Sequence, residues 1–496
     1  MPGVTFSKLP YAFPHSNIQT WKTIQSRTTF LSGFEPSEYD CCINSCCCFV
    51  GPYAEHTQCV HCNEPRFDSI GKSRQVFVYL PVIPRLKAFL SNQEMAAKMQ
   101  YRSQHQHNPG ITKDVFDSTH YRSLLAQKVS INNRFLNHTF FSDFRDIALG
   151  LTTDGFAPFR RRKKTAWPMI LINYNLPPEV RFHADNILSL GVIPGPKKPH
   201  DWDSFAWPLI QELLELQVGI HTYDKLADEF FALHAYLILV FGDIPAVSML
   251  MRMKGHNGLS PCRMCSIHGV RIPNSRTPVH YVPLDRSRHP NAISSSIAPH
   301  YDPRSLPLRT QTQFMQQAQE VQSAEGESDY DNLAKVYGIK GIPALSVLSS
   351  LSFPLSFPYD FMHLVWENVI KNLIGLWTGE YKALDEGSES YQIQQTVWEA
   401  IGAASLASGS LIPTAFGPRP PNIASDKTSW TADTRSFWTL FLGPVLLRGR
   451  FLNEKYYRHF TDLVRLLNLC LQFEISRVEI ESLRGGFIKW VEDYEK

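Results

Sequence analysis

The chain contains 496 residues, of which 43% are hydrophobic, 12% aromatic and 19% charged, and its net charge is +3. A chain of this length buries a sizeable core and would divide into about two to four domains, which excludes a miniprotein. The composition excludes a disordered tail. With so low a net charge, binding of an acidic polymer would depend on local basic patches.

The most apolar stretch, FFALHAYLILVFGDIPAVSMLM, contains His234 and Asp243 and falls short of an uninterrupted membrane span. We therefore expect a buried strand there and no membrane partner. The start of the chain lacks the basic region, apolar core and cleavage site of a secretory signal. This pattern predicts a reducing compartment, in which cysteines are thiols or metal ligands.

The first segment, residues 1–75, is rich in cysteine. Seven of the ten cysteines lie in CCINSCCCFVGPYAEHTQCVHC. Two pairs, Cys42 with Cys46 and Cys59 with Cys62, have the spacing of a zinc ribbon and predict a structural Zn²⁺ site. Three neighbours leave the choice of ligands open; they are Cys41, Cys47 and Cys48.

The rest of the chain predicts an α/β fold, because strand patterns are followed by helical ones. Residues 76–139 are expected to form a helical connector. Apolar runs that end in DGF, PPE and GD predict strands within 140–269, with a helix over SFAWPLIQELLELQVGI. The Pro-, Ser- and Arg-rich region 270–355 predicts an insertion or linker. Residues 356–385 predict a core helix, and 386–496 a mostly helical region.

Three acidic residues are candidates for catalysis. Asp154 and Asp243 follow apolar strands, and carboxylates at strand ends can converge over one edge of a sheet. Glu367 lies in the helix DFMHLVWENVIKNL, on a common face with His363. Carboxylates of this kind could hold two Mg²⁺ or Mn²⁺ ions for phosphoryl transfer. The alternative is that Asp154 belongs to a turn, Asp243 caps a helix and Glu367 is a solvated helix residue.

Cys262 and Cys265 form half of a second zinc site. Their partners could be His256 and His268 nearby, or a distant Asp-x-x-His pair, Asp360 and His363. The alternative roles of this distant pair are a helix N-cap for Asp360 and core packing for His363.

Two basic stretches could bind a DNA backbone or could be solvated turns, and the first could also be a nuclear-import signal. The residues are Arg160, Arg161, Arg162, Lys163 and Lys164 in the first stretch, and Lys197 and Lys198 in the second.

Four blocks, in order, resemble the core of CACTA-type (En/Spm-like) transposases of plants and fungi. The blocks are ALGLTTDGFAPFRRRKKTAWPMILINYNLPPEVRF, GVIPGPKKPHDWDSFAWPLIQELLELQVGI, GDIPAVSMLMRMKGHNGLSPCRMC and YDFMHLVWENVIKNL. The segment CINSCCCFVGPYAEHTQCVHCNEPRF resembles the N-terminal cysteine motif of that family. The resemblance covers about residues 38–496 and rests on the ordered set of blocks.

The resemblance implies an RNase H-like catalytic core, a mixed sheet with flanking helices that an insertion interrupts. It assigns Asp154 and Asp243 as the first two acids of a DDE triad. Glu367 is our choice for the third acid, and Glu380 competes with it. The later Asp-x-x-His element of the family falls on Asp360 and His363, so zinc would join these residues to Cys262 and Cys265.

The implied activity is metal-assisted DNA cleavage and strand transfer at transposon ends, by a nuclear protein that acts as a homo-oligomer on terminal repeats and target DNA. The alternative is a degenerate or domesticated derivative that binds DNA or a protein without cutting. Two features keep this alternative open: the chain ends at WVEDYEK in an apparent helix, and the N-terminal segment lacks an obvious DNA-binding module.

Overall fold

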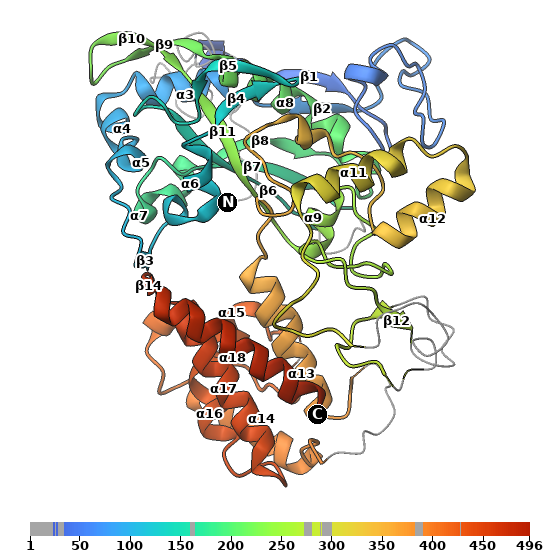
Figure 1. Cartoon of the computed structure of the whole chain (residues 1–496), viewed down its shortest axis with the longest axis vertical. Helices are drawn as coiled ribbons and strands as arrows, with labels where there is room; N and C mark the ends of the chain where they lie inside the picture. The colour runs from blue at the N-terminus through green and yellow to red at the C-terminus, as the bar shows by residue number, and fades with distance from the viewer. Residues whose placement is uncertain are drawn as a thin grey trace, which may run out of the picture.

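The computed structural model describes residues 23–24, 26–27, 34–158, 164–271, 280–287, 289, 300–381, 390–426 and 428–496. A mixed six-stranded sheet forms its centre, and a group of C-terminal helices lies below that sheet in Figure 1. The strands neighbour one another in the order β1 (Ser37–Asp40), β2 (Val76–Tyr79), β8 (Leu188–Ile193), β7 (Trp167–Asn173), β6 (Ile147–Thr153) and β11 (Ala235–Phe241). The predicted α/β class is confirmed at this level.

Strands β6, β7 and β8 are antiparallel neighbours, whereas β11 returns parallel to β6. The parallel return requires a long connection. It runs through α8 (Trp202–Val218) and the hairpin of β9 (Ile220–Asp224) and β10 (Glu229–Leu233). Because β6 and β11 are parallel neighbours, their carboxyl ends meet at one edge of the sheet.

Both faces of the sheet are buried, which explains the continuous apolar runs in the sequence. In β6, Ile147, Leu149 and Leu151 join the core that α8 covers. Ala148 between them joins a second core with Phe140 on the opposite face. No helix among the described residues is long and apolar enough to cross a membrane.

The N-terminal region and the expected connector both contribute to the sheet. β1 pairs with β2 and β2 with β8, so the start of the expected connector, residues 76–79, is a strand of the sheet. Short elements follow β2. They are α3 (Ile83–Leu90), α4 (Gln93–Lys98), α5 (Tyr101–Gln104), β3 (Ile111–Thr112), α6 (Thr119–Leu124), β4 (Lys128–Ile131) and β5 (Arg134–Thr139).

The insertion contains two helices, α11 (Gln311–Gln322) and α12 (Glu327–Tyr337), which pack beside the sheet in Figure 1. Two short strands precede these helices within the insertion, β12 (Val270–Arg271) and β13 (His280–Tyr281). Two short helices lie earlier in the chain, α7 (Pro178–Arg181) and α9 (Ile244–Leu250). Phe314 and Ala318 of α11 and Ile339 after α12 belong to the same core as α8. This part of the insertion is therefore packed structure rather than a free linker.

The C-terminal region has a core of its own, as the predicted helical region requires. It begins with a π-helix at Met362–Ile370 (η6), which α13 (Lys371–Trp377) continues. The other elements are α14 (Gln395–Ser408), α15 (Ala432–Phe437), a π-helical turn at Trp438–Leu442 (η8), α16 (Gly443–Leu446), α17 (Glu454–Cys470), β14 (Ile475–Ser476) and α18 (Arg477–Glu495). Strand β14 pairs with β3 and so links this region to the upper part of the molecule.

One buried carboxyl in α8 should make stability depend on pH. Burial, and then the nearby charge of Asp201, raises the pKa of Asp203 to about 7, against the opposing effects of Arg252 and the Ala344 N–H. The pKa of Asp203 is higher in the folded chain than in the unfolded chain. Below about pH 4 the side chain is protonated in both states, so it does not lower the free energy of unfolding. From about pH 4 to about pH 7 the buried charge lowers the free energy of unfolding progressively.

We expect Asp203→Asn to gain stability relative to the wild type as pH rises. The difference in free energy of unfolding should grow by about 4 kcal/mol between pH 4 and pH 8. Urea unfolding at both pH values measures it, with the exposed Asp185→Asn as control. A difference that does not change with pH would show that Asp203 is ionised throughout this range.

Candidate active site at the end of the parallel strands

Two predicted catalytic residues lie side by side at the sheet edge. In the parallel pairing of β11 with β6, Phe241 is opposite Thr152. Asp243 and Asp154 each follow two residues later, so the same register brings them level just beyond the strands. The two backbone segments also approach closely here: a Cβ atom added to Gly242 would lie 2.9 Å from the carbonyl oxygen of Thr153. The register of β6 and β11 thus creates a pair of carboxylates.

Each carboxylate is fixed by a local hydrogen bond. Asp243 caps α9, where its Oδ1 accepts from the Ala246 N–H at 2.5 Å. Asp154 Oδ1 accepts from the Gly155 N–H at 2.6 Å. The capping role that the sequence offered as an alternative for Asp243 is therefore real, and it leaves the second carboxylate oxygen available to a ligand.

The pKa of Asp154 is raised, which shows how charges gather at this edge. Burial is the largest cause, and the Gly155 N–H opposes it. The negative charges of Asp243 and Asp360 raise the pKa further, whereas His363 lowers it. Like charges that repel in this way favour a bound cation.

Asp360 is the residue that sequence reasoning did not place with the aspartate pair. It precedes η6, and its Oδ2 lies 3.0 Å from His363 Nδ1, while its Oδ1 accepts from the His363 N–H at 3.1 Å. Its N-cap position was visible in the sequence. Its proximity to Asp154 was not, because more than two hundred residues separate them along the chain.

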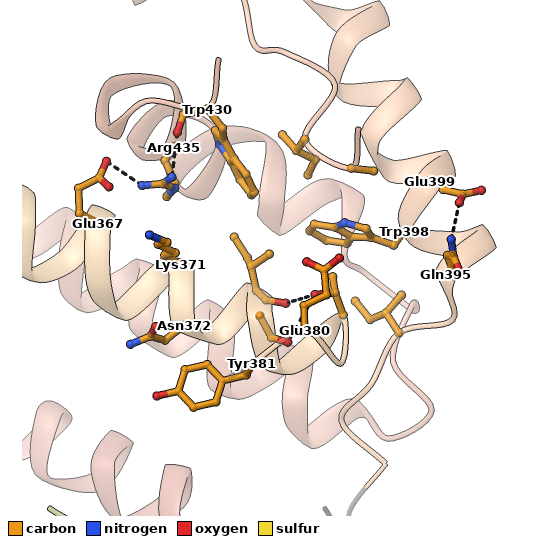
Figure 2. Close-up of a pocket in the computed structure, with 16 residues that line it drawn as sticks. Glu367, Lys371, Asn372, Glu380, Tyr381, Gln395, Trp398, Glu399, Trp430 and Arg435 are labelled. Carbon is orange, nitrogen blue, oxygen red and sulfur yellow. Dashed lines mark hydrogen bonds and ion pairs between the residues drawn. The ribbon is translucent and has the colours of Figure 1, made fainter. Parts of the chain in front are cut away.

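Glu367 has an ion-pair partner that the sequence did not reveal. Its carboxylate forms an ion pair with Arg435 at 2.8 Å. Figure 2 shows it at a pocket of about 880 Å³ in the C-terminal helical region, which Lys371 and Glu380 also line. The i→i+5 hydrogen bonds of η6 widen each turn, so residues that would share a face of an α-helix are rotated differently. The role of Glu367 as third acid stays a prediction.

Cys262 and Cys265 lie against the segment that precedes η6. The Cys262 thiol is 3.3 Å from the Tyr359 hydroxyl, and Arg263 Nε donates to the Phe357 carbonyl at 2.9 Å. A hydrogen bond from the Cys265 thiol is the main cause that lowers the pKa of Cys262, to about 5. The chain thus returns close to the Cys-x-x-Cys pair from about a hundred residues away.

The ligand atoms of the second predicted zinc site do not all converge. Within the described residues, the one group of three or more candidate ligands whose atoms lie within 4.8 Å of one another is in the N-terminal segment. Cys262, Cys265, Asp360 and His363 do not form such a group. The His363 ring is hydrogen-bonded to Asp360 and lies near Asp154. A zinc ion shared by these four residues stays a prediction.

Comparison with known families identifies the part of the chain that carries the aspartate pair. Residues 128–289 match the family model described as transposase family tnp2, the En/Spm (CACTA) family. We call residues 128–289 the tnp2 domain, after the family model that they match. The match includes Asp154, Asp243 and the Cys-x-x-Cys pair, and it ends before Asp360. No curated protein matches the chain.

N-terminal to the tnp2 domain, the predicted cysteine cluster is confirmed. The ligand atoms of Cys42, Cys46, Cys59 and Cys62 all lie within 4.8 Å of one another. The Cys42 and Cys62 sulfurs are 3.5 Å apart. Four sulfurs at about 2.3 Å from a tetrahedral zinc would be about 3.8 Å apart, so these four residues fit that ion.

The structure also separates these ligands from their neighbours. The backbones of Cys41 and Cys48 form an antiparallel bridge, and both side chains lie in the core that α8 covers. Cys47 is 3.8 Å from Cys59 but lies outside the four-ligand group. The sequence left this choice open, because five adjacent cysteines have nearly equivalent spacings.

The basic residues of the tnp2 domain are only partly described. Arg160, Arg161, Arg162 and Lys163 lie outside the described residues. Lys164, Lys197 and Lys198 are exposed, and the Thr165 N–H donates to Pro196 at 3.2 Å, so the two basic loops are adjacent. Lys198 Nζ donates to the Pro245 carbonyl at 3.4 Å and lies 5.4 Å from the Trp167 ring centroid. Lys198 is therefore close to Asp243.

Proposed function

We propose that the tnp2 domain cuts and joins DNA strands as a DDE-type transposase, with Asp154 and Asp243 as the first two acids. The observation that carries this proposal is the register of β6 and β11, which makes the two carboxylates neighbours at one sheet edge. A mixed sheet with flanking helices and acids at the ends of adjacent strands also supports an RNase H-like core.

The residues at this edge fit Mg²⁺ or Mn²⁺. Both ions prefer carboxylate oxygens, and Asp154 and Asp243 would hold them, with Asp360 near enough to contribute. When bound, such ions supply charge stabilisation at the phosphate and a more acidic water. The donor set contains anionic oxygens only, which is the chemistry that a hard cation requires.

The reaction would proceed in two displacements. In the first, a water oxygen bonds to phosphorus while the bond from phosphorus to O3′ breaks. The proton that the water loses passes to solvent or to a carboxylate, and the departing O3′ takes up a proton from solvent. This leaves a 3′-hydroxyl and a 5′-phosphate. In the second, that 3′-hydroxyl bonds to a target phosphorus and displaces a target 3′-oxygen. Lys198 would hold a neighbouring phosphate, because its ammonium group lies beside Asp243.

We predict that the third acid can be assigned by comparing conservative amide variants. If Glu367 serves, as the resemblance implies, Glu367→Gln should reduce cleavage about 10³-fold, because a metal contact contributes several kcal/mol to the transition state. If Asp360 serves, Asp360→Asn should do so and Glu367→Gln should only weaken the contact with Arg435. Glu380→Gln tests the competing residue. Cleavage rates with Mg²⁺, together with thermal melts, separate these outcomes.

The remaining parts of the proposal follow from the family. The substrates would be transposon terminal repeats and target DNA, the protein would act in the nucleus, and it would assemble as a homo-oligomer on DNA. Zn²⁺ would occupy the N-terminal cysteine cluster. The second candidate function is a DNA- or protein-binding derivative that no longer cuts, and the pairing of Glu367 with Arg435 favours it.

A cleavage and strand-transfer assay on DNA that carries the element's terminal repeats tests the proposal. The wild type should nick this DNA and join it to a target with Mg²⁺ or Mn²⁺ but not with EDTA. Binding of the repeats without cleavage in either metal would support the second function instead.

A further inference from the structure

Four cations from three separate segments gather along α9, the helix that begins at Asp243. Arg252 and Lys254 follow α9, Lys340 follows α12 in the insertion, and Lys198 belongs to the loop before α8. We call these four residues the cation strip. Only Lys198 among them was a candidate for DNA binding from the sequence, and Lys340 lies outside the segment that matches the tnp2 family.

Backbone pairing determines which way three of these side chains face. Met253 and Ile339 form an antiparallel bridge, with the Lys254 N–H donating to Gly338 at 2.8 Å and the Lys340 N–H donating to Arg252 at 2.6 Å. Side chains alternate between the two faces of such a pair. Met253 and Ile339 are buried in the core, so Arg252, Lys254 and Lys340 share the outer face.

The four cations of the strip repel one another electrostatically. Burial, and then the charges of Lys198, Arg252 and Lys254, lower the pKa of Lys340. Arg252 also has a left-handed backbone, with φ of +50°, which is strained for a residue other than glycine. Charges that repel one another on a partly exposed surface do not stabilise the fold, and they are well suited to an anionic ligand.

Nearby carboxylates neutralise only part of this charge. Lys254 has an ion pair with Asp331 at 3.7 Å, in which Asp331 is largely exposed. Asp203 near Arg252 has a pKa of about 7 and is therefore only partly ionised at neutral pH. Lys198 and Lys340 have no ion pair among the described residues.

The strip also begins at the right place for a substrate strand. Helix α9 joins Asp243 to the strip and contains seven residues, so it is about 10 Å long. With about 3.4 Å of rise per nucleotide of one strand, this corresponds to roughly three nucleotides. The DNA backbone could therefore follow α9 from the carboxylates to Arg252.

We propose that the cation strip binds the phosphate backbone of the DNA strand, from Lys198 beside the proposed cleavage site to Arg252, Lys254 and Lys340 about three nucleotides away. The insertion would then contribute directly to DNA binding through Lys340. This inference rests on the proposed function for the choice of ligand, but its contacts are with phosphates and do not depend on sequence.

The test measures binding without chemistry. Fluorescence anisotropy with a 30-base-pair duplex in EDTA gives the affinity of the full chain between about 50 and 200 mM salt. The double variant Lys254→Gln/Lys340→Gln should lower the slope of log K against log salt by about 1.8, because each lost phosphate contact accounts for about 0.9. Between 50 and 200 mM salt, the wild type should therefore lose about tenfold more affinity than the double variant loses.

The matched control is Lys225→Gln/Lys335→Gln, which removes two exposed lysines from the β9–β10 turn and from α12. It should bind with nearly the wild-type slope. Thermal melts should show no loss of stability in the strip variant, because its side chains repel one another. A strip variant with the same slope and affinity as the control would overturn the proposal.

The result is separable from that for the proposed function. If the strip variant binds DNA like the control while Asp243→Asn abolishes cleavage, the strip proposal fails and the transposase proposal stands. If the strip variant loses binding while Asp243→Asn still cuts, the strip stands and the catalytic assignment fails.

Discussion

Replacing Asp243 by asparagine is expected to reduce DNA cleavage and strand transfer by about 10³-fold, because loss of a carboxylate that holds the proposed cation removes several kcal/mol of transition-state stabilisation. The substitution separates chemistry from folding. Asparagine is as good an N-cap as aspartate, so the hydrogen bond to Ala246 and the start of α9 should persist. Asp154→Asn should have a similar effect on cleavage.

Three measurements make this prediction specific. Cleavage rates with Mg²⁺ and Mn²⁺ report the chemistry, thermal melts report the fold, and DNA anisotropy in EDTA reports binding. The exposed Asp185→Asn in the same tnp2 domain is the matched control and should cleave at the wild-type rate. Cleavage by Asp243→Asn within a few-fold of the wild type would exclude the carboxylate pair as the catalytic centre.

The second large effect is expected at the N-terminal cysteine cluster. Cys59→Ser should remove one bound Zn²⁺ per chain and lower the melting temperature by many degrees, because structural zinc contributes on the order of 10 kcal/mol to folding of small units. The loss should extend into the sheet. Cys41 and Cys48, beside the cluster, pack in the core that α8 covers. Strands β1 and β2, which flank the cluster in the sequence, pair with each other in the sheet.

Metal analysis and calorimetry of purified protein test this second prediction. Cys470→Ser, a free cysteine in α17, is the control and should retain both the metal and the melting temperature. Zinc content that is unchanged in Cys59→Ser would contradict the assignment. The same measurement on Cys262→Ser tests the second zinc ion that the sequence predicts near Asp360.

The sequence by itself determined the parts of this protein that depend on local spacing. The ligands Cys42, Cys46, Cys59 and Cys62 lie within about twenty residues, so short loops bring them together in almost any fold. The strands that end at Asp154 and Asp243 were readable because both faces of a central strand are apolar and polar turn residues follow. Given two such strands as parallel neighbours, convergence of the two aspartates required no further information.

Only the tertiary structure decided what depends on register and on distant contacts. Asp360 lies near Asp154, and Lys340 lies beside Arg252, because chain segments separated by tens to hundreds of residues pair through backbone groups that are the same in every residue. Glu367 is paired with Arg435 because the helix that carries it has π-helical turns and packs against the C-terminal core, which spacing on an ideal α-helix cannot reveal. Side chains specify the local elements, whereas the packing of whole elements selects which charges finally meet.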